Sequence, residues 1–204
     1  MDSRDNSEFV LRSPSLGEAD QLAELGRDTF VETFGHLYSP VNLDRFLRLQ
    51  YGPTLQANQL ADPKNGIQVA IHDNRFVGYV RVGANTVPFA EPGRTTGELK
   101  QIYVRRGYLG NGLAPRLMDW GMAWLRSRGY QDVLLSVYSQ NLRAQRFYER
   151  YGFAKFADHF FMVGDHRDEE FIFRARLVLP SRSSSPIAPE VSPIPPPINN
   201  TPQS

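Results

Sequence analysis

Between residues 9 and 179, segments with the hydrophobic pattern of strands alternate with segments that have the pattern of helices. Apolar residues that recur every three to four positions indicate amphipathic helices, and short alternating or continuous apolar runs indicate strands. This alternation restricts the fold to the α/β or α+β class. A segment of this length buries a sizeable core, so we predict one domain over residues 9–179.

The two ends of the chain have a different composition. Residues 1–8 are polar, and residues 180–204 are rich in Pro, Ser, Ile and Asn, with Arg182 and Glu190 as their only charged residues. Such segments cannot bury enough apolar surface to offset the entropy lost on ordering. We therefore expect a flexible arm over 1–8 and a disordered Pro/Ser-rich tail over 180–204.

The predicted elements of the domain follow from periodicity and from turn residues. The predicted strands are 9–11, 66–72, 75–82, 98–104, 133–137, 153–162 and 170–177. Helices are predicted at 18–34, 112–128 and 141–153, with another helical region at 41–60. Asp73 and Asn74 favour a hairpin turn, and the short link after residue 162 favours an antiparallel pair of closing strands.

Composition excludes several classes of site. The chain has 0 cysteines, which excludes disulfides, thiolate nucleophiles and cysteine-based metal sites. The 4 histidines are scattered without ligand spacing, so no metal is expected. A net charge of +1 argues against a nucleic-acid partner. No segment approaches the about 20 apolar residues of a membrane span, and we expect a cytoplasmic protein without a membrane partner.

A glycine-rich segment at residues 103–115 links a predicted strand to a predicted helix. Gly110 and Gly112 allow main-chain N–H groups to approach an anion, and the first turn of a helix adds unpaired donors and the positive end of its dipole. Pro115 fits this first turn because no donor is needed there. The pattern favours a backbone anion site and a plain tight turn equally. It matches neither a P-loop nor a dinucleotide fingerprint.

A second segment follows the apolar strand at 133–137. Asn141 is a good helix N-cap, Gly152 suits the helix C-terminus, and Ala144, Phe147 and Tyr148 share one helix face. On this pattern alone, Tyr148 is a core residue rather than an acid.

Together the two segments resemble the GNAT superfamily of N-acetyltransferases. In that family a strand, a loop of the form Gln/Arg-x-x-Gly-x-Gly/Ala and a helix bind the pyrophosphate of acetyl-CoA. The matching residues are Leu109-Gly110-Asn111-Gly112-Leu113-Ala114 and, for the second signature, Asn141-x-x-Ala144-x-x-Phe147-Tyr148-x-x-Tyr151-Gly152-Phe153. Leu109 replaces Gln or Arg, so main-chain donors are expected to hold the phosphates. The resemblance implies a mixed central sheet of about six to seven strands flanked by helices, with a splayed central parallel pair.

The resemblance also implies the site. Acetyl-CoA is the expected co-substrate, bound by Ile102, Tyr103, Val104, Leu109, Gly110, Asn111, Gly112, Leu113, Ala114, Asn141, Ala144, Phe147 and Tyr148. A main-chain N–H near Ile102 or Tyr103 is expected to hold the oxyanion. Tyr148 matches the family tyrosine that faces the sulfur, and its reference pKa of about 10 lies near the about 8.5 of a thiol, so it is the expected general acid. Glu98 matches a catalytic glutamate of some relatives. We weigh two interpretations of it equally: a general base that takes the proton of the amine directly or through water, and an ordinary solvated carboxylate at the end of a strand.

Three short stretches, 29–34, 39–42 and 160–165, are similar to the PaiA-type spermidine/spermine acetyltransferases. The first of them borders the acceptor site in that subgroup. Asp28 and Glu32 lie four residues apart on one helix face, where like charges repel and a bound polycation would offset the repulsion. We expect Asp28, Glu32 and Phe34 to bind the acceptor; an ordinary solvated acidic face is the alternative.

The sequence thus predicts an acetyl-CoA-dependent N-acetyltransferase that acts on a primary amine by direct attack in a ternary complex. The expected acceptor is a polyamine or another small amine. Two alternatives stay open: acetylation of a peptide N-terminus or protein lysine, and a CoA-sensing module without turnover. A homodimer is also left open.

Overall fold

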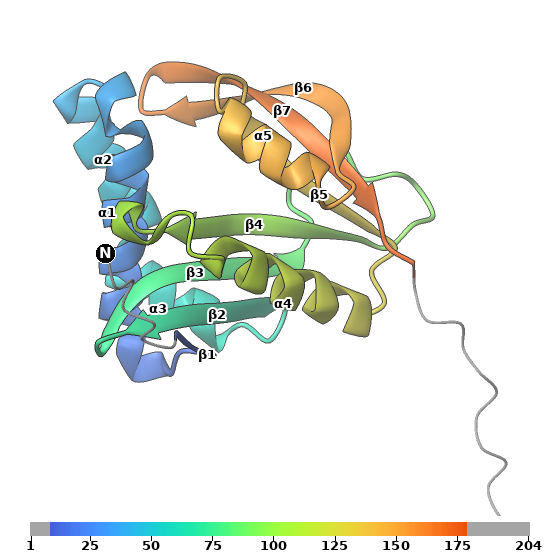
Figure 1. Cartoon of the computed structure of the whole chain (residues 1–204). Helices are drawn as coiled ribbons and strands as arrows, with labels where there is room; N and C mark the ends of the chain where they lie inside the picture. The colour runs from blue at the N-terminus through green and yellow to red at the C-terminus, as the bar shows by residue number, and fades with distance from the viewer. Residues whose placement is uncertain (1–8, 179–204) are drawn as a thin grey trace, which may run out of the picture.

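The computed structural model describes residues 9–178, which form a seven-stranded mixed sheet with helices on both faces (Figure 1). The strands are β1 Val10–Arg12, β2 Asn65–His72, β3 Arg75–Ala84, β4 Thr96–Val104, β5 Asp132–Tyr138, β6 Ala154–Val163 and β7 His166–Arg176. Their order is β1-β2-β3-β4-β5-β7-β6, and only β4 and β5 are parallel. The predicted fold class is confirmed. The predicted arm (1–8) and tail (180–204) lie outside the described residues.

Two tight turns set the hairpins of this sheet. Asp73 and Asn74, between β2 and β3, both adopt positive φ angles, of 47° and 58°. Such angles suit a two-residue hairpin, and the short polar side chains of Asp and Asn tolerate them. Gly164, with φ 61°, connects β6 to β7, which pair antiparallel from Ala154 to Val163. Both predicted hairpins are confirmed.

The helices begin and end near the predicted positions, with one exception. They are α1 Ala19–Phe34, α2 Pro40–Gln50, α3 Pro53–Ala61, α4 Leu113–Ser127 and α5 Leu142–Glu149, with short 3-10 turns η1 Leu16–Glu18, η2 Gly35–Leu37 and η3 Arg106–Tyr108. The predicted helical region at 41–60 is two helices. Pro53 interrupts it because proline lacks the N–H that a continuing helix needs, and it begins α3 at a position where that donor is not required.

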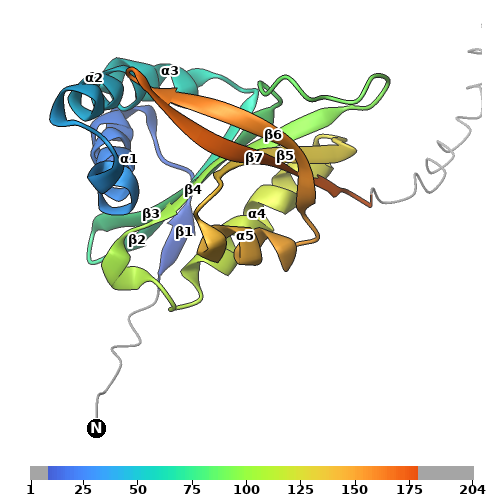
Figure 2. The ribbon, with the colours of Figure 1, turned by 90° about the horizontal axis from the view of Figure 1, so that it is seen from above.

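The helices cover opposite faces of the sheet: α1, α2 and α3 lie on one face, and α4 and α5 on the other (Figure 2). Leu22 and Leu25 of α1 are fully buried against Val69 of β2. On the other face, Leu117 and Leu125 of α4 are fully buried against the central strands. The two helix layers thus leave the central parallel pair, β4 and β5, sandwiched between them.

Trp120 and Trp124 of α4 are only partly buried, at the margin of the core. The indole of Trp124 packs directly on Gly66 of β2, where a Cβ atom would come within 2.6 Å of the ring. A glycine is therefore required at this point of close approach between α4 and the sheet.

Candidate active site

A cleft of about 1210 Å³ lies between β4 and β5. It forms because the two parallel strands pair only at one end, where Thr96–Glu98 oppose Asp132–Leu134. Beyond this point β4 continues with β3, and β5 continues with β7 as far as Tyr138 (Figure 1). The main-chain groups on the β5 side of β4 consequently have no strand partner. Ile102, Tyr103 and Val104, three predicted binding residues, line the cleft there.

One end of the cleft is an anion cradle at the start of α4. Gly110 and Gly112 have φ angles of 87° and 74°, a region that glycine enters without strain, and a Cβ atom on either would meet nothing within 4 Å. The first intrahelical hydrogen bond runs from Arg116 N to Gly112 O at 3.4 Å, so the N–H groups of Leu113 and Ala114 before it remain available. Open space, free donors and the helix dipole together fit a pyrophosphate group.

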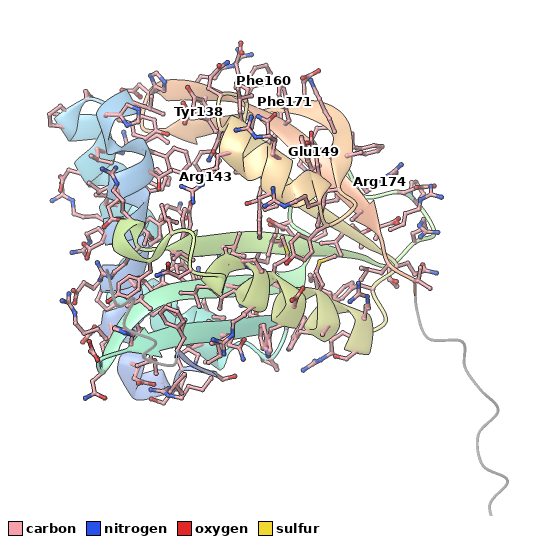
Figure 3. All side chains as sticks on the ribbon, viewed as in Figure 1. Tyr138, Arg143, Glu149, Phe160, Phe171 and Arg174 are labelled. Atoms are coloured by element: carbon pink, nitrogen blue, oxygen red, sulfur yellow. The ribbon has the colours of Figure 1, made fainter. Side chains whose placement is uncertain are left out.

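The predicted residues of this loop fall into two groups. Leu109, Gly110, Gly112, Leu113 and Ala114 line the cleft, whereas Asn111 is exposed and lies outside its lining. Five arginines also line the cleft: Arg81 of β3, and Arg106, Arg143, Arg146 and Arg150, which lie in η3 and in or next to α5. Figure 3 shows Arg143 extending from α5 toward the space between α5 and β4. Leu109 stands where the loop pattern has Gln or Arg and therefore offers no side-chain donor to a phosphate. The guanidinium groups of the last four of these arginines can supply that contact.

The helix α5 carries the predicted acid. Asn141 caps this helix by accepting a hydrogen bond from Ala144 N at 3.1 Å, as predicted. Tyr148 lines the cleft, and its ring packs against Phe147 and Phe153 at centroid distances of 5.6 and 6.1 Å. Burial raises the pKa of the Tyr148 hydroxyl, and within residues 9–178 that hydroxyl forms no hydrogen bond. The group is therefore protonated at neutral pH and able to donate.

Glu98 lines the cleft near the end where β4 and β5 pair. Its Oε2 atom accepts from Thr86 N at 2.7 Å, from Thr86 Oγ1 at 2.6 Å and from Lys100 Nζ at 2.9 Å. Only 9% of the residue is exposed. The solvated strand end considered as the alternative is therefore wrong, because Glu98 is a buried partner of Lys100. Its predicted role as a base stays a prediction.

The acidic face of α1 has partners within the chain. Asp28 pairs with Arg105 Nη1 at 2.7 Å and lies outside the cleft lining. Glu32 accepts a hydrogen bond from Arg106 N at 2.8 Å, and Arg106 Nη2 donates to the Glu32 carbonyl at 2.6 Å. Arg105 thus supplies the positive charge beside Asp28, and a main-chain N–H supplies a donor to Glu32, so a bound polycation is not required to offset their repulsion. The predicted role of this pair in acceptor binding stays a prediction. Of the predicted acceptor residues, Phe34 and Glu32 line the cleft.

The other end of the cleft holds two carboxylates from β7 that sequence reasoning did not identify. Asp168 is 5% exposed and accepts a hydrogen bond from the Tyr38 hydroxyl, with His166 Nε2 at 3.2 Å from its other oxygen. Glu170 accepts a hydrogen bond from the Ser136 hydroxyl. Within residues 9–178 neither carboxylate has a Lys or Arg partner. Burial, and then repulsion by Asp168, raise the pKa of Glu170.

Aromatic side chains from both walls surround these carboxylates. The rings that line this end of the cleft are Phe30, Phe34, Tyr38, Phe46, Tyr51, Tyr103, Tyr138 and Phe161. Phe34 contacts Tyr138 edge to face, with centroids 6.2 Å apart, which joins α1 to the end of β5. The arrangement places two anionic groups in a largely aromatic part of the cleft, between β7 and the end of α1.

A search of residues 9–178 finds no group of three or more His, Asp or Glu residues that could hold a metal ion. None of the helices in this described part combines the length and the apolar character needed to cross a bilayer.

A sheet opened around a cleft, whose lining contains a pyrophosphate cradle at a helix start, a protonated tyrosine and two carboxylates, is the arrangement of an acetyl-CoA-dependent N-acetyltransferase. Residues 21–153 match the model of the acetyltransferase (GNAT) family, and the chain belongs to this family. The predicted family, fold and acyl donor are confirmed.

Relatives and solved structures agree with this assignment. An uncharacterised N-acetyltransferase of Mycobacterium tuberculosis is 31% identical over 80% of this chain and 100% of its own length. A spermidine N(1)-acetyltransferase of Thermoplasma acidophilum is 20% identical over 70% of this chain and 86% of that protein. The crystal structure of PaiA N-acetyltransferase from Thermoplasma acidophilum with coenzyme A superposes with a TM-score of 0.67 at 18% identity, over 83% of this chain and 99% of that one.

Proposed function

We propose that this N-acetyltransferase moves the acetyl group of acetyl-CoA to a primary amine of a small molecule, by direct attack in a ternary complex. The observation that carries the proposal is the pair of β7 carboxylates, Asp168 and Glu170, which line the same cleft as the cradle. An alkylamine, with a reference pKa of about 10.4, arrives as an ammonium ion. The buried Asp168 and the partly buried Glu170, which have no Lys or Arg partner in the described part of the chain, attract such an ion.

Direct attack requires that the ammonium lose a proton before its nitrogen bonds to the acetyl carbon. Glu170 is suited to accept it, because burial raises its pKa toward that of the amine. Glu98, acting through water, is the other candidate base. The carbon–sulfur bond then breaks, and the Tyr148 hydroxyl gives its proton to the departing thiolate. The acetylated nitrogen loses its second proton, which restores the Tyr148 hydroxyl through water, while Glu170 releases the first proton to solvent. A cysteinyl acyl-enzyme is excluded because the chain has 0 cysteines.

Two kinds of small amine fit this site. Polyamines are supported by the carboxylate pair and by the likeness to a spermidine acetyltransferase. An amine that also carries an anionic group is supported by a different observation: the Arg81 guanidinium lines the cleft and has no ion-pair partner among residues 9–178. Both belong to the primary amines, so the proposed reaction is the same for each.

The test is release of CoA from acetyl-CoA in the presence of polyamines, amino acids, aminoglycosides and peptides. Thiol detection carries no background from the protein, which has 0 cysteines. We expect at least one small amine to be acetylated, and Glu170→Gln to reduce turnover by about 10²-fold or more. Glu169→Gln is the matched control, because Glu169 is exposed on the opposite face of β7.

Two outcomes would overturn the proposal, and a third would overturn the role of Glu170 in it. Turnover with peptides alone would move the acceptor to a peptide N-terminus or lysine. Binding of acetyl-CoA without turnover of any amine would leave a CoA-sensing module. Equal turnover by the Glu170 and Glu169 variants would remove Glu170 from the reaction.

A further inference from the structure

The acceptor end of the cleft contains a positive charge that the proposed reaction does not use. Arg81 of β3 lines the cleft and is partly buried. Its Nε atom donates to Gln101 Oε1 at 3.1 Å. Throughout residues 9–178 no carboxylate forms an ion pair with this guanidinium, whereas the neighbouring Lys100 is paired with Glu98 at 2.9 Å. The two terminal nitrogens of Arg81 thus remain available as donors.

The surroundings of Arg81 are polar but mostly neutral. Tyr51, Tyr79 and Tyr103 lie close enough to interact electrostatically with the guanidinium, as does Glu98. Burial lowers the pKa of Arg81, and these groups oppose that effect. A guanidinium keeps its charge in a protein under all ordinary conditions. A buried cation without a counter-ion is costly, and an anionic ligand group would remove much of this cost.

Arg81 is also close to the reacting groups. The Tyr103 hydroxyl interacts electrostatically with Arg81, and likewise with Glu170 and Tyr148. The Tyr103 hydroxyl is therefore electrostatically coupled to Arg81, to one of the two β7 carboxylates and to the predicted acid, all of which line the same cleft. Arg81 extends from β3, while Asp168 and Glu170 extend from β7, so that the two charges come from opposite sides of the cleft.

We propose that the acceptor is a small amine that carries a carboxylate group, which Arg81 holds while the amino group faces Asp168 and Glu170. This inference rests on the proposed function and narrows it to amino-acid-like acceptors. The planar fork of a guanidinium matches a carboxylate with two parallel hydrogen bonds. A linear polyamine has no such group and would bring a second cation toward Arg81, where like charges repel.

The first test compares amines that differ only in the carboxylate. L-Ornithine and putrescine form one such pair, and L-phenylalanine and phenethylamine form another. For the wild-type enzyme we expect kcat/KM to be about tenfold or more higher for the carboxylated member of at least one pair, as expected for one charged hydrogen-bonded contact.

The second test uses Arg81→Gln, with Arg75→Gln as the matched control because Arg75 is exposed on the same strand. Arg81→Gln should lower kcat/KM for the carboxylated amine by about tenfold or more. It should leave kcat/KM for the decarboxylated amine unchanged or raise it. Arg81→Lys should recover part of the loss, since it restores the charge without the fork. If the melting temperature shows that Arg81→Gln does not fold, two measurements still test the inference: the kcat/KM values of Arg81→Lys, and the kcat/KM ratio of each amine pair in the wild-type enzyme.

The outcomes separate this inference from the proposed function. Preference for the decarboxylated amines, or equal loss with both members of a pair in Arg81→Gln, would overturn the inference and leave amine acetylation standing. If no amine is turned over, the proposed function fails. Calorimetric binding of the same pairs to the CoA-bound protein then tests Arg81 alone, and tighter binding of the decarboxylated member would overturn its role.

Discussion

Replacing Glu32 with Ala tests what the acidic face of α1 does. The Glu32 carboxylate accepts a hydrogen bond from the main-chain N–H of Arg106, which begins η3 just ahead of the glycine cradle. We expect this contact to position the cradle. Its loss should therefore weaken the binding of acetyl-CoA and leave the binding of the amine unchanged. The sequence, by contrast, predicts that Glu32 binds the acceptor.

The size of the effect follows from what the substitution removes and what it keeps. A hydrogen bond between a main-chain N–H and a carboxylate contributes about 0.5–1.5 kcal/mol when it is partly exposed. The second contact, from Arg106 Nη2 to the Glu32 carbonyl at 2.6 Å, uses the main chain and survives the change. Since about 1.4 kcal/mol corresponds to a tenfold change, KM for acetyl-CoA should rise about two- to tenfold.

Steady-state kinetics with each substrate varied in turn measure the two KM values separately. Glu32→Gln should have a smaller effect than Glu32→Ala, because its amide oxygen can still accept from Arg106 N. Asp20→Asn is the control, as Asp20 is exposed on the same helix and contacts neither Arg105 nor Arg106. A raised KM for the amine with an unchanged KM for acetyl-CoA would refute the positioning role.

Three further predictions concern the cleft. Gly112→Val should abolish acetyl-CoA binding in calorimetry, because φ is 74° there and the side chain fills the cradle, whereas Gly107→Ala, at a position with ordinary φ, should bind normally. Tyr148→Phe should lower kcat by about 10²–10⁴-fold with little change in CoA affinity, while Tyr151→Phe, whose hydroxyl bonds Pro115, should stay active. Burial raises the pKa of Glu170, so turnover should rise with pH through a value above the ordinary glutamate pKa, as Glu170 loses its proton. Glu170→Gln should lose this rise on the acidic side of the pH profile, and an unchanged profile in that variant would contradict the role of Glu170 as the base.

The fold could be predicted largely from the sequence because its signals are local. Asp73-Asn74 specifies a hairpin, Asn141 and Gly152 delimit a helix, and each feature acts within a few residues. The one misjudged element, the helical region at 41–60, contained its own signal: Gly52-Pro53 ends one helix and begins another. The cradle was equally local, since one loop supplies both its glycines and its helix start.

The acceptor end could not be predicted in the same way, because it is assembled from distant strands. Asp168 lies in the polar link before the predicted strand 170–177, and Glu170 is the first residue of that strand. The sequence did not indicate that β7 inserts beside β5 and turns the common face of the two residues into the cleft. One sign was present: Ile172 follows at the same spacing of two, and it is fully buried. Arg81 likewise occupies an ordinary strand position, and only the pairing of β3 with β4 brings it to the site.

The charge of the whole chain, +1, conceals how charge is arranged in the cleft. Arg106, Arg143, Arg146 and Arg150 line it, in keeping with a substrate that carries several phosphates, while Asp168 and Glu170 occupy its acceptor end. Fields of opposite sign at the two ends orient both substrates before they meet. A small polycation would be drawn to the acids but also repelled by the unpaired Arg81, whereas an amine with its own carboxylate satisfies both. Arg81, which would hold the carboxylate, and the two acids, which would hold the amino group, would therefore together align the nitrogen of such an acceptor with the acetyl group.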